Sequence, residues 1–160
     1  MTVLFSDSQI ADLIAENKPV PYDWRSRIQL RPKRGHRERD LDLTGDQGSK
    51  FRLIFRQNTI NGLDFSLILA VTVPGSSQVF RLRRYNGKSH EHTNHIEGTT
   101  FYDFHIHTAT ERYQAMGTRE DASAAPTDRY ADFHGALRCL VEDTHVIAPP
   151  DAQGHLFGED

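Results

Sequence analysis

Apolar and polar residues alternate through the middle of the chain, and this pattern predicts β-strands. Four segments show it most clearly, and they begin near Phe51, Phe65, Phe80 and Tyr102. Successive side chains of a strand point to opposite faces of its sheet, so each segment has one apolar face and one polar face. Asn61-Gly62 and Pro74-Gly75 are typical turn sequences between the first three segments. Such short turns place neighbouring strands antiparallel.

Helical periodicity flanks these strands at both ends of the chain. Ser6 is a candidate N-cap for an apolar stripe that includes Ile10 and Ile14. A second stripe, from Tyr130 to Val141, has the spacing of a helix packed on a sheet. The pattern therefore predicts an α+β fold. We expect a four- to five-stranded antiparallel sheet, with the N- and C-terminal helices covering one face.

The composition fits a single domain over residues 1–160. Hydrophobic residues make up 37% of the chain and charged residues 26%, which allows one modest core. Residues 19–49 combine three prolines with dense charge and predict a basic, irregular arm. Residues 149–160 predict a frayed, acidic tail.

Three features indicate a cytoplasmic protein that does not associate with membranes. No apolar run is long enough to span a bilayer. The first residues lack the basic start and the long apolar stretch of a signal peptide. Cys139 is the only cysteine, so no intrachain disulfide can form, as suits a reducing compartment.

The net charge of −3 conceals an uneven distribution of charge. Seven basic residues and one acid lie between residues 24 and 39, whereas nine acids and two arginines lie between residues 120 and 160. A basic front suits a protein that meets a polyanion such as RNA on one side. Solvated loops would show the same distribution, so the charge alone leaves both interpretations open.

The polar faces of the predicted strands carry the candidate chemistry. The last two strands should pair, so that Arg81, Arg83, His105 and His107 share one face, opposite Phe80, Leu82, Phe104 and Ile106. The candidate catalytic residues are His105, His107, Arg81, Arg83 and Tyr85. The candidate substrate-binding residues are Arg52, Arg56, Lys88, His90, His92 and Asp103.

Three interpretations of this cluster remain open. In the first, His105 and His107 are the acid–base pair of a metal-independent RNA endonuclease, because imidazole exchanges protons near neutral pH. Arg81 and Arg83 then hold the phosphate, Tyr85 is an auxiliary group, and no cofactor is needed.

In the second interpretation, the histidines bind Zn²⁺ or another transition metal. The candidate ligands are His90, His92, His105 and His107, with Glu91, Glu97 or Asp103 as carboxylates. No set of cysteines and histidines has the spacing of a closed structural zinc site, so folding should not need metal. In the third interpretation, the histidines are solvated side chains, or the chain is a non-catalytic module that binds nucleic acid or protein.

Short motifs of the chain resemble those of small bacterial and archaeal toxin-like proteins, in which an Arg-Tyr-Asp/Asn strand precedes a His-x-His strand. The elements that carry the resemblance are Arg83-Arg84-Tyr85-Asn86, His90 and His105-Ile106-His107. It covers less than half of the chain and implies an RNA-cleaving toxin with an antitoxin as its protein partner. Arg83, Tyr85, His105 and His107 match the shared elements. Residues 51–114 also resemble an uncharacterised bacterial and phage-encoded family, which implies no function.

Overall fold

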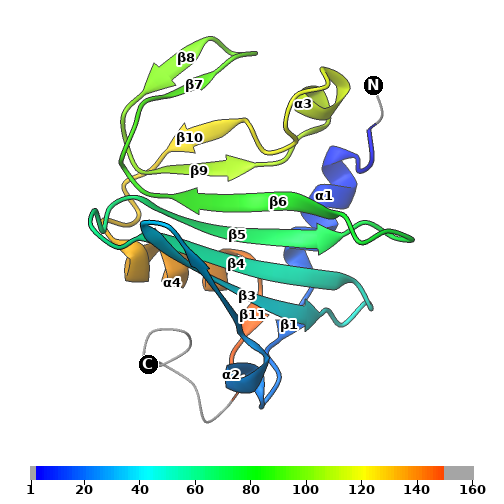
Figure 1. Ribbon diagram of the computed structural model, residues 1–160. Coiled ribbons are helices and arrows are strands. Elements are labelled where there is room, and N and C mark those ends of the chain that lie inside the picture. The colour runs from blue at the N-terminus through cyan, green and yellow to red at the C-terminus, as the bar shows by residue number, and fades with distance from the viewer. Residues whose placement is uncertain (1–2, 150–160) are drawn as a thin grey trace.

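The computed structural model describes residues 3–149 and combines four helices with a large antiparallel sheet (Figure 1). The helices are α1 (Asp7–Ala15), α2 (Trp24–Arg27), α3 (Glu111–Ala115) and α4 (Phe133–Asp143). The strands of the large sheet are β2 (Gln29–Lys33), β3 (His36–Thr44), β4 (Lys50–Asn58), β5 (Phe65–Thr72), β6 (Val79–Asn86), β9 (His105–Thr108) and β10 (Ala124–Pro126). Two short pairs complete the fold: β1 (Lys18–Pro19) with β11 (Val146–Ile147), and β7 (His92–Asn94) with β8 (Thr99–Phe101).

The predicted α+β class with an antiparallel sheet is confirmed, but the sheet is larger than expected. Its order is β10-β9-β6-β5-β4-β3-β2, which makes seven strands in place of four or five. The expected frayed tail lies outside the described residues, apart from residue 149. Within residues 3–149, no helix is both long enough and apolar enough to cross a membrane.

Two of the additional strands come from the segment that was expected to be an irregular arm. Residues 19–49 contain β2 and β3, and β3 pairs with β4 along its whole length. Gly35, with a φ of +81°, closes the turn between β2 and β3. Alternation is hidden here because β3 runs past the core: Leu41 and Leu43 are buried, whereas Arg37 on the same face is exposed. Dense charge was therefore a poor sign of irregular structure.

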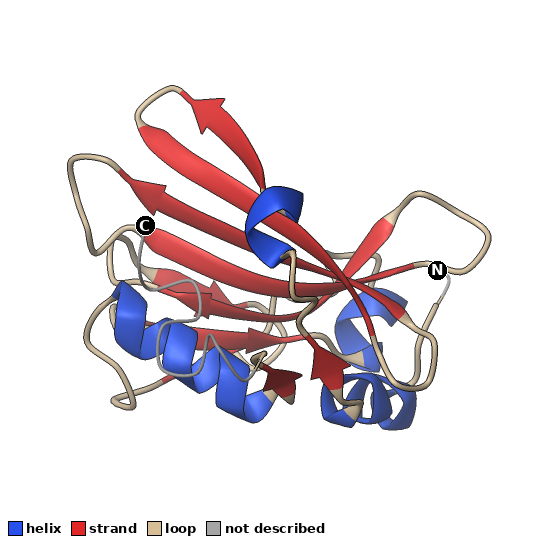
Figure 2. Cartoon of the chain, turned by 90° about the horizontal axis from the view of Figure 1, so that it is seen from below, coloured by secondary structure: helices blue, strands red, loops and turns tan. Residues whose placement is uncertain are grey.

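One apolar core lies between the large sheet and two helices. Alternate residues of β4 and β5, such as Leu53 and Leu67, are fully buried. Ile10 of α1 and Leu140 of α4 belong to the same cluster. Figure 2 shows the two longer helices on one side of the strands, which leaves the other face of the sheet without a helical layer.

A β-bulge in β6 changes which residues face this core. Ala70 of β5 pairs with Arg81, but Leu69 pairs with Arg83, so Leu82 is an extra residue in β6. Residues opposite each other on paired strands share a face. Beyond the bulge, Arg83 and Tyr85 therefore lie on the core face, and Arg84 lies on the open face.

The expectation that Arg81, Arg83, His105 and His107 share one face is consequently wrong for Arg83. Strand β9 pairs His107 with Arg84, and His105 with Asn86. The histidines therefore share the open face with Arg81, Arg84 and Asn86. The expectation assumed strict two-residue alternation along an unbulged strand. A single extra residue is enough to move Arg83 to the opposite face of the sheet.

Lys18 is a fully buried cation that joins the ends of two helices. Its Nζ donates hydrogen bonds to the carbonyl oxygens of Ile14 at 2.9 Å, Glu16 at 2.7 Å and Thr144 at 2.7 Å. These carbonyls lie at the C-terminal ends of α1 and α4, where intrahelical donors are missing and the helix dipole is negative. Burial lowers the pKa of Lys18 to about 8, so the ammonium group stays protonated at neutral pH.

Replacing Lys18 by Met should lower the free energy of unfolding by about 2–4 kcal/mol, because three carbonyl groups lose their donor. Urea unfolding followed by circular dichroism measures this change. The matched control is Lys50→Met, since Lys50 is exposed and bonds only the Thr44 hydroxyl in the described structure. It should cost less than about 0.5 kcal/mol. Equal losses in the two variants would contradict the role given to Lys18.

Candidate metal centre

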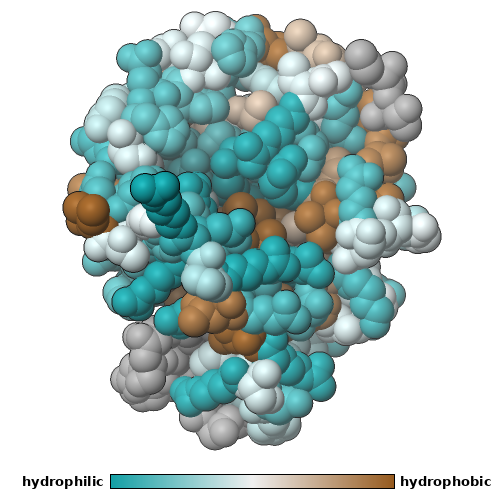
Figure 3. Space-filling model, in the orientation of Figure 1, coloured by the Kyte–Doolittle hydropathy of each residue, from teal (hydrophilic) through white to brown (hydrophobic). Residues whose placement is uncertain are grey.

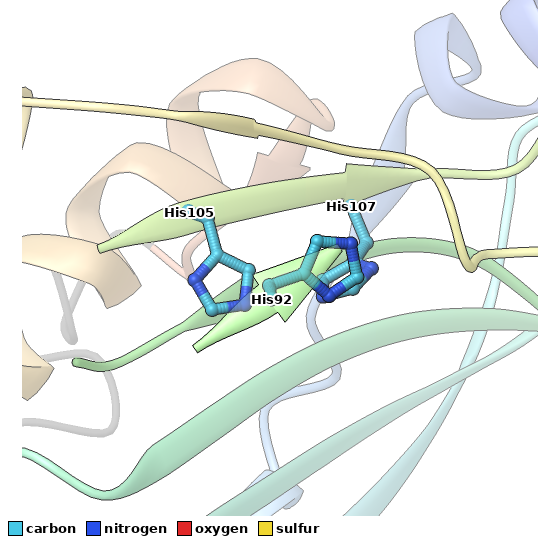
Figure 4. Close-up of side chains that lie close together, drawn as sticks. All are labelled: His92, His105 and His107. Atoms are coloured by element: carbon cyan, nitrogen blue, oxygen red, sulfur yellow. The ribbon is translucent and has the colours of Figure 1, made fainter. Parts of the chain in front are cut away.

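Three imidazole rings converge on the open face of the sheet. Figure 4 shows His105 and His107 on β9 and His92 on β7 in front of it. The ring centroids are 5.0 Å apart for His105 and His107, 5.3 Å for His92 and His105, and 4.8 Å for His92 and His107. One nitrogen of each ring lies within 4.8 Å of the other two. His105 and His107 are buried, and His92 is half-buried.

Hydrogen bonds fix the proton on one nitrogen of each ring. His105 Nδ1 donates to the carbonyl oxygen of Asp103 at 2.7 Å, and His107 Nδ1 donates to that of Asp121 at 2.6 Å. Carbonyl oxygens only accept hydrogen bonds, so these nitrogens must carry the proton. Nε2 of both rings is therefore unprotonated while the rings are neutral. Histidines that bind metals usually have their second nitrogen fixed in this way.

The ring of His92 is fixed by the side-chain amide of Asn94, whose orientation is set by its own hydrogen bonds. Asn94 Nδ2 donates to the Ala124 carbonyl at 2.6 Å and to the Thr99 hydroxyl at 3.0 Å. Its Oδ1 accepts from the Ala124 N–H at 2.8 Å, and His92 Nε2 lies 2.9 Å from the same oxygen. Nε2 of His92 therefore carries the proton, and Nδ1 is the free nitrogen. The same amide attaches the β7–β8 hairpin to β10.

Asn86 places a fourth polar group at the cluster. Its Nδ2 lies 3.4 Å from Nε2 of His105 and 3.4 Å from Nε2 of His107, and its Oδ1 accepts from the Ser66 hydroxyl at 2.9 Å. A hydroxyl can accept a hydrogen bond as well as donate one. The amide can thus turn over, keep its bond to Ser66 and present Oδ1 to the two imidazoles.

The two buried imidazoles are poor proton carriers at neutral pH. Burial lowers the pKa of His105 to about 4, although its hydrogen bond to Asp103 opposes the shift. Burial, with the positive charge of Arg84, lowers the pKa of His107 to about 2. Both rings are therefore neutral at pH 7. Neutral imidazole is the form that binds metals, whereas acid catalysis needs a protonated ring.

Three arginines surround one buried carboxylate beside His107. The Nε atoms of Arg81, Arg84 and Arg119 lie 3.6 Å, 3.1 Å and 2.8 Å from Asp121 carboxylate oxygens. Burial lowers the pKa of Arg84 to about 10, so its guanidinium remains charged at neutral pH. Nη2 of Arg84 also lies 3.4 Å from Nδ1 of His107. Both nitrogens carry protons, so this approach is a contact between donors.

A pocket of about 310 Å³ adjoins the histidine cluster. Its lining includes Arg56, Arg84 and Arg119, together with His90, His92 and His107. At the end of β6, Gly87 allows a close approach of the chain, since a Cβ there would overlap the carbonyl oxygen of Leu63. The pocket therefore connects the cluster, at His92 and His107, to a set of arginines.

No family model matches this chain. No curated protein and no solved structure matches it either. The chemistry of the site therefore rests on its own geometry, and the resemblance to toxin-like proteins stays a prediction.

The structure brings several of the predicted site residues together. His92, His105 and His107 form the cluster, and Arg56 and His90 line the pocket beside it. Arg81 lies on the same face but is held by Glu120 and Asp121.

Other predicted residues lie elsewhere or act differently. Tyr85 is buried on the core face, where its hydroxyl donates to Asp143 at 2.7 Å, and Arg83 lies on the same face. Arg52 pairs with Asp42, and Lys88 lies over the ring of Tyr102. Asp103 is exposed to solvent, and its backbone carbonyl accepts the hydrogen bond from His105.

Several residues of the site were not predicted from the sequence, Arg119 among them. Asn94 stands two positions after His92 and so shares its face of the strand, which is a spacing signal that could have revealed it. Arg84 and Asn86 required knowledge of the bulge. Asp121 is distant in sequence from the arginines of β6, and no local pattern indicates its role. Its position depends on how the loop between α3 and β10 folds back onto the sheet.

His105 and His107 should remain neutral, with the proton on Nδ1, at pH 6 in the folded, metal-free protein. The physical reason is that burial lowers the pKa of both imidazoles, to about 4 and about 2. Long-range ¹H–¹⁵N spectra of the imidazole nitrogens report both charge and tautomer. Signals are assigned from His105→Gln and His107→Gln. A ring that titrates near pH 6.5 would contradict this electrostatic description.

The free energy of unfolding should also fall as the pH falls from about 6.5 to about 4. Unfolded histidines have a pKa of about 6.5, so the unfolded chain binds more protons than the folded chain in this range. Protonation therefore favours unfolding, and the stability that these rings provide is present above pH 6.5. The slope against pH should be shallower in a His105→Gln/His107→Gln double variant.

Proposed function

We propose that this protein is a metal-dependent hydrolase whose metal ion, Zn²⁺ or a similar transition metal, is bound by His92, His105 and His107. The observation that carries the proposal is the convergence of three imidazoles whose hydrogen bonds each leave one ring nitrogen unprotonated. Three protein ligands with an open position are typical of catalytic zinc sites, whereas structural sites use four.

The dimensions of the cluster support this assignment. Zinc–nitrogen bonds of about 2.0–2.1 Å in a tetrahedral site place ligand atoms about 3.3 Å apart. One nitrogen of each ring lies within 4.8 Å of the other two, so a metal ion bound by that set needs a closure of at most about 1.5 Å. The Asn86 amide lies 3.4 Å from Nε2 of both His105 and His107. It is placed to hydrogen-bond a water at the open position, so the three imidazoles remain the protein ligands.

Hydrolysis is the reaction class that such a site favours. A bound metal ion lowers the pKa of a water ligand toward 7 and so provides hydroxide at neutral pH. The pocket lies directly beside the cluster, where a substrate could meet that nucleophile. The imidazoles then act as ligands, and burial lowers the pKa of His105 and His107, which keeps both rings in the neutral form that binds metal.

RNA remains the first substrate to examine, because the resemblance predicts it and the basic segment between residues 24 and 39 suits a polyanion. A mechanism without metal is less well supported by the site. The Nδ1 protons of His105 and His107 are held by backbone carbonyls, and Arg83 and Tyr85 lie on the other face of the sheet. An antitoxin partner stays a prediction from the resemblance alone.

Wild-type protein should bind one Co²⁺ or Zn²⁺ per chain. Replacing His92, His105 or His107 by Ala should weaken binding by roughly 100-fold or more, since each change removes a ligand. Calorimetric titration measures the affinity, and the visible spectrum of Co²⁺ reports the geometry. Metal at 100 times its dissociation constant should stabilise the fold by about 2.7 kcal/mol.

His95→Ala is the matched control, because His95 is exposed and belongs to the same histidine-rich loop outside the cluster. It should bind metal as wild type does. Thermal unfolding of each metal-free variant shows whether the fold is retained. A wild-type protein that binds no metal, or an equal loss in His95→Ala, would overturn the assignment.

RNA cleavage should require metal, stop in EDTA and return when Co²⁺ or Zn²⁺ is restored. Its rate should rise with pH to a plateau as the metal-bound water ionises near pH 7. An acid–base pair of imidazoles would instead give a bell-shaped profile. Full activity in EDTA, combined with loss of activity in His105→Ala, would favour the metal-independent endonuclease over the present proposal.

A further inference from the structure

A cluster of arginines beside the pocket, two of which line it, carries positive charge that the neighbouring carboxylates do not neutralise. Arg81, Arg84 and Arg119 share the carboxylate of Asp121, and Glu120 pairs only with Arg81 in the described structure. Three cations thus meet two anions. The Asp121 side chain is 0% exposed and that of Arg84 is 14% exposed, so solvent screens the charge of Arg84 weakly, whereas Arg81 and Arg119 are 33% and 44% exposed.

Arg56, on β4, adds a further positive charge to the pocket. It lies in a row across the sheet that continues through Ser66 and Asn86 to His105. Glu38 is its neighbour on β3, but that carboxylate is 3.8 Å from Lys33. Among residues 3–149, no carboxylate forms an ion pair with Arg56.

Three guanidiniums therefore reach one pocket from three separate parts of the chain. Arg56 comes from β4, Arg84 from β6, and Arg119 from the loop before β10. Asp64 is the one carboxylate among the described residues of the lining, and it accepts hydrogen bonds from neighbouring side chains. The face turned to the viewer in Figure 3, opposite the helices, is mostly hydrophilic.

A metal ion at the histidines would increase this excess. Three neutral imidazoles compensate none of the charge of a divalent cation, and the Asn86 amide beside them is neutral as well. The metal-bound pocket therefore favours an anion that contacts the metal and the arginines together.

We propose that this pocket is an anion subsite for the phosphoryl group of a substrate, so that the substrate is a phosphate ester. This inference rests on the proposed function and names the substrate class of that site. A planar guanidinium matches pairs of phosphate oxygens. Cations that approach from several directions suit a tetrahedral phosphate better than a flat carboxylate, which has only two oxygens in one plane.

Calorimetric titration with phenyl phosphate tests the subsite in the Co²⁺-loaded protein. Arg56→Gln and Arg119→Gln should each weaken binding roughly tenfold or more, because each removes a charge-assisted hydrogen bond. Arg84 is left unchanged because it contacts His107. The matched control is Arg52→Gln, since Arg52 is on the same face but pairs with Asp42 outside the pocket. Benzoate, a carboxylate of similar size, should bind at least roughly tenfold more weakly than phenyl phosphate.

Co²⁺ affinity, measured in the same variants, separates the two proposals. If Co²⁺ binds normally but both pocket variants keep wild-type affinity for phenyl phosphate, the subsite is overturned and the metal site stands. Equal binding of benzoate overturns the phosphate assignment. If Co²⁺ fails to bind, the proposed function fails. The metal-free protein then tests the subsite. Phenyl phosphate binding that is weakened by Arg56→Gln and Arg119→Gln supports the subsite. Phenyl phosphate binding that these changes leave unaltered overturns it.

Discussion

One extra residue in a strand determines the chemistry that the open face of this sheet can carry. Leu82 shifts the pairing of β6 against β5, and every later residue of β6 changes face as a result. Arg84 and Asn86 thereby lie on the open face with the histidines, whereas Arg83 lies on the core face, which the helices cover. In a regular strand the cluster would face a different pair of side chains. The long antiparallel ladder holds this arrangement rigid, because both neighbours of β6 are paired with it.

Burial gives the histidines their character. A solvated pair of imidazoles would exchange protons near neutral pH, but His105 and His107 lie beneath the β7–β8 hairpin and beside charged arginines. Both effects disfavour the imidazolium form. The environment that weakens them as acids preserves them as ligands, since a metal ion competes with a proton for the same lone pair. Buried backbone carbonyls then select which nitrogen remains available.

Local pattern revealed the parts of the molecule in which one face is buried along the whole element. The alternation in β4 and β5 and the capped stripe of α1 are examples, and each follows from periodic burial. The pattern failed in β3, where the strand extends beyond the core and charge occupies both faces. It could not place Arg83, because a bulge has no simple periodicity. The role of Asp121 depends on contacts between segments distant in sequence, which spacing alone does not encode, whereas the spacing of Asn94 from His92 does place both on one face of the strand.

The hairpin that carries His92 has a kinetic consequence. His105 and His107 belong to the large sheet, whereas within residues 3–149 β7 and β8 pair only with each other. Their hairpin is held by the Asn94 amide at β10 and by the Tyr113 hydroxyl at Ile96 and Glu97. An incoming ion would therefore meet two preorganised ligands first, and the third would arrive when the hairpin closes. Release would follow the reverse order. The lifetime of a bound ion would then be set by opening of a small appendage, on a timescale independent of global unfolding.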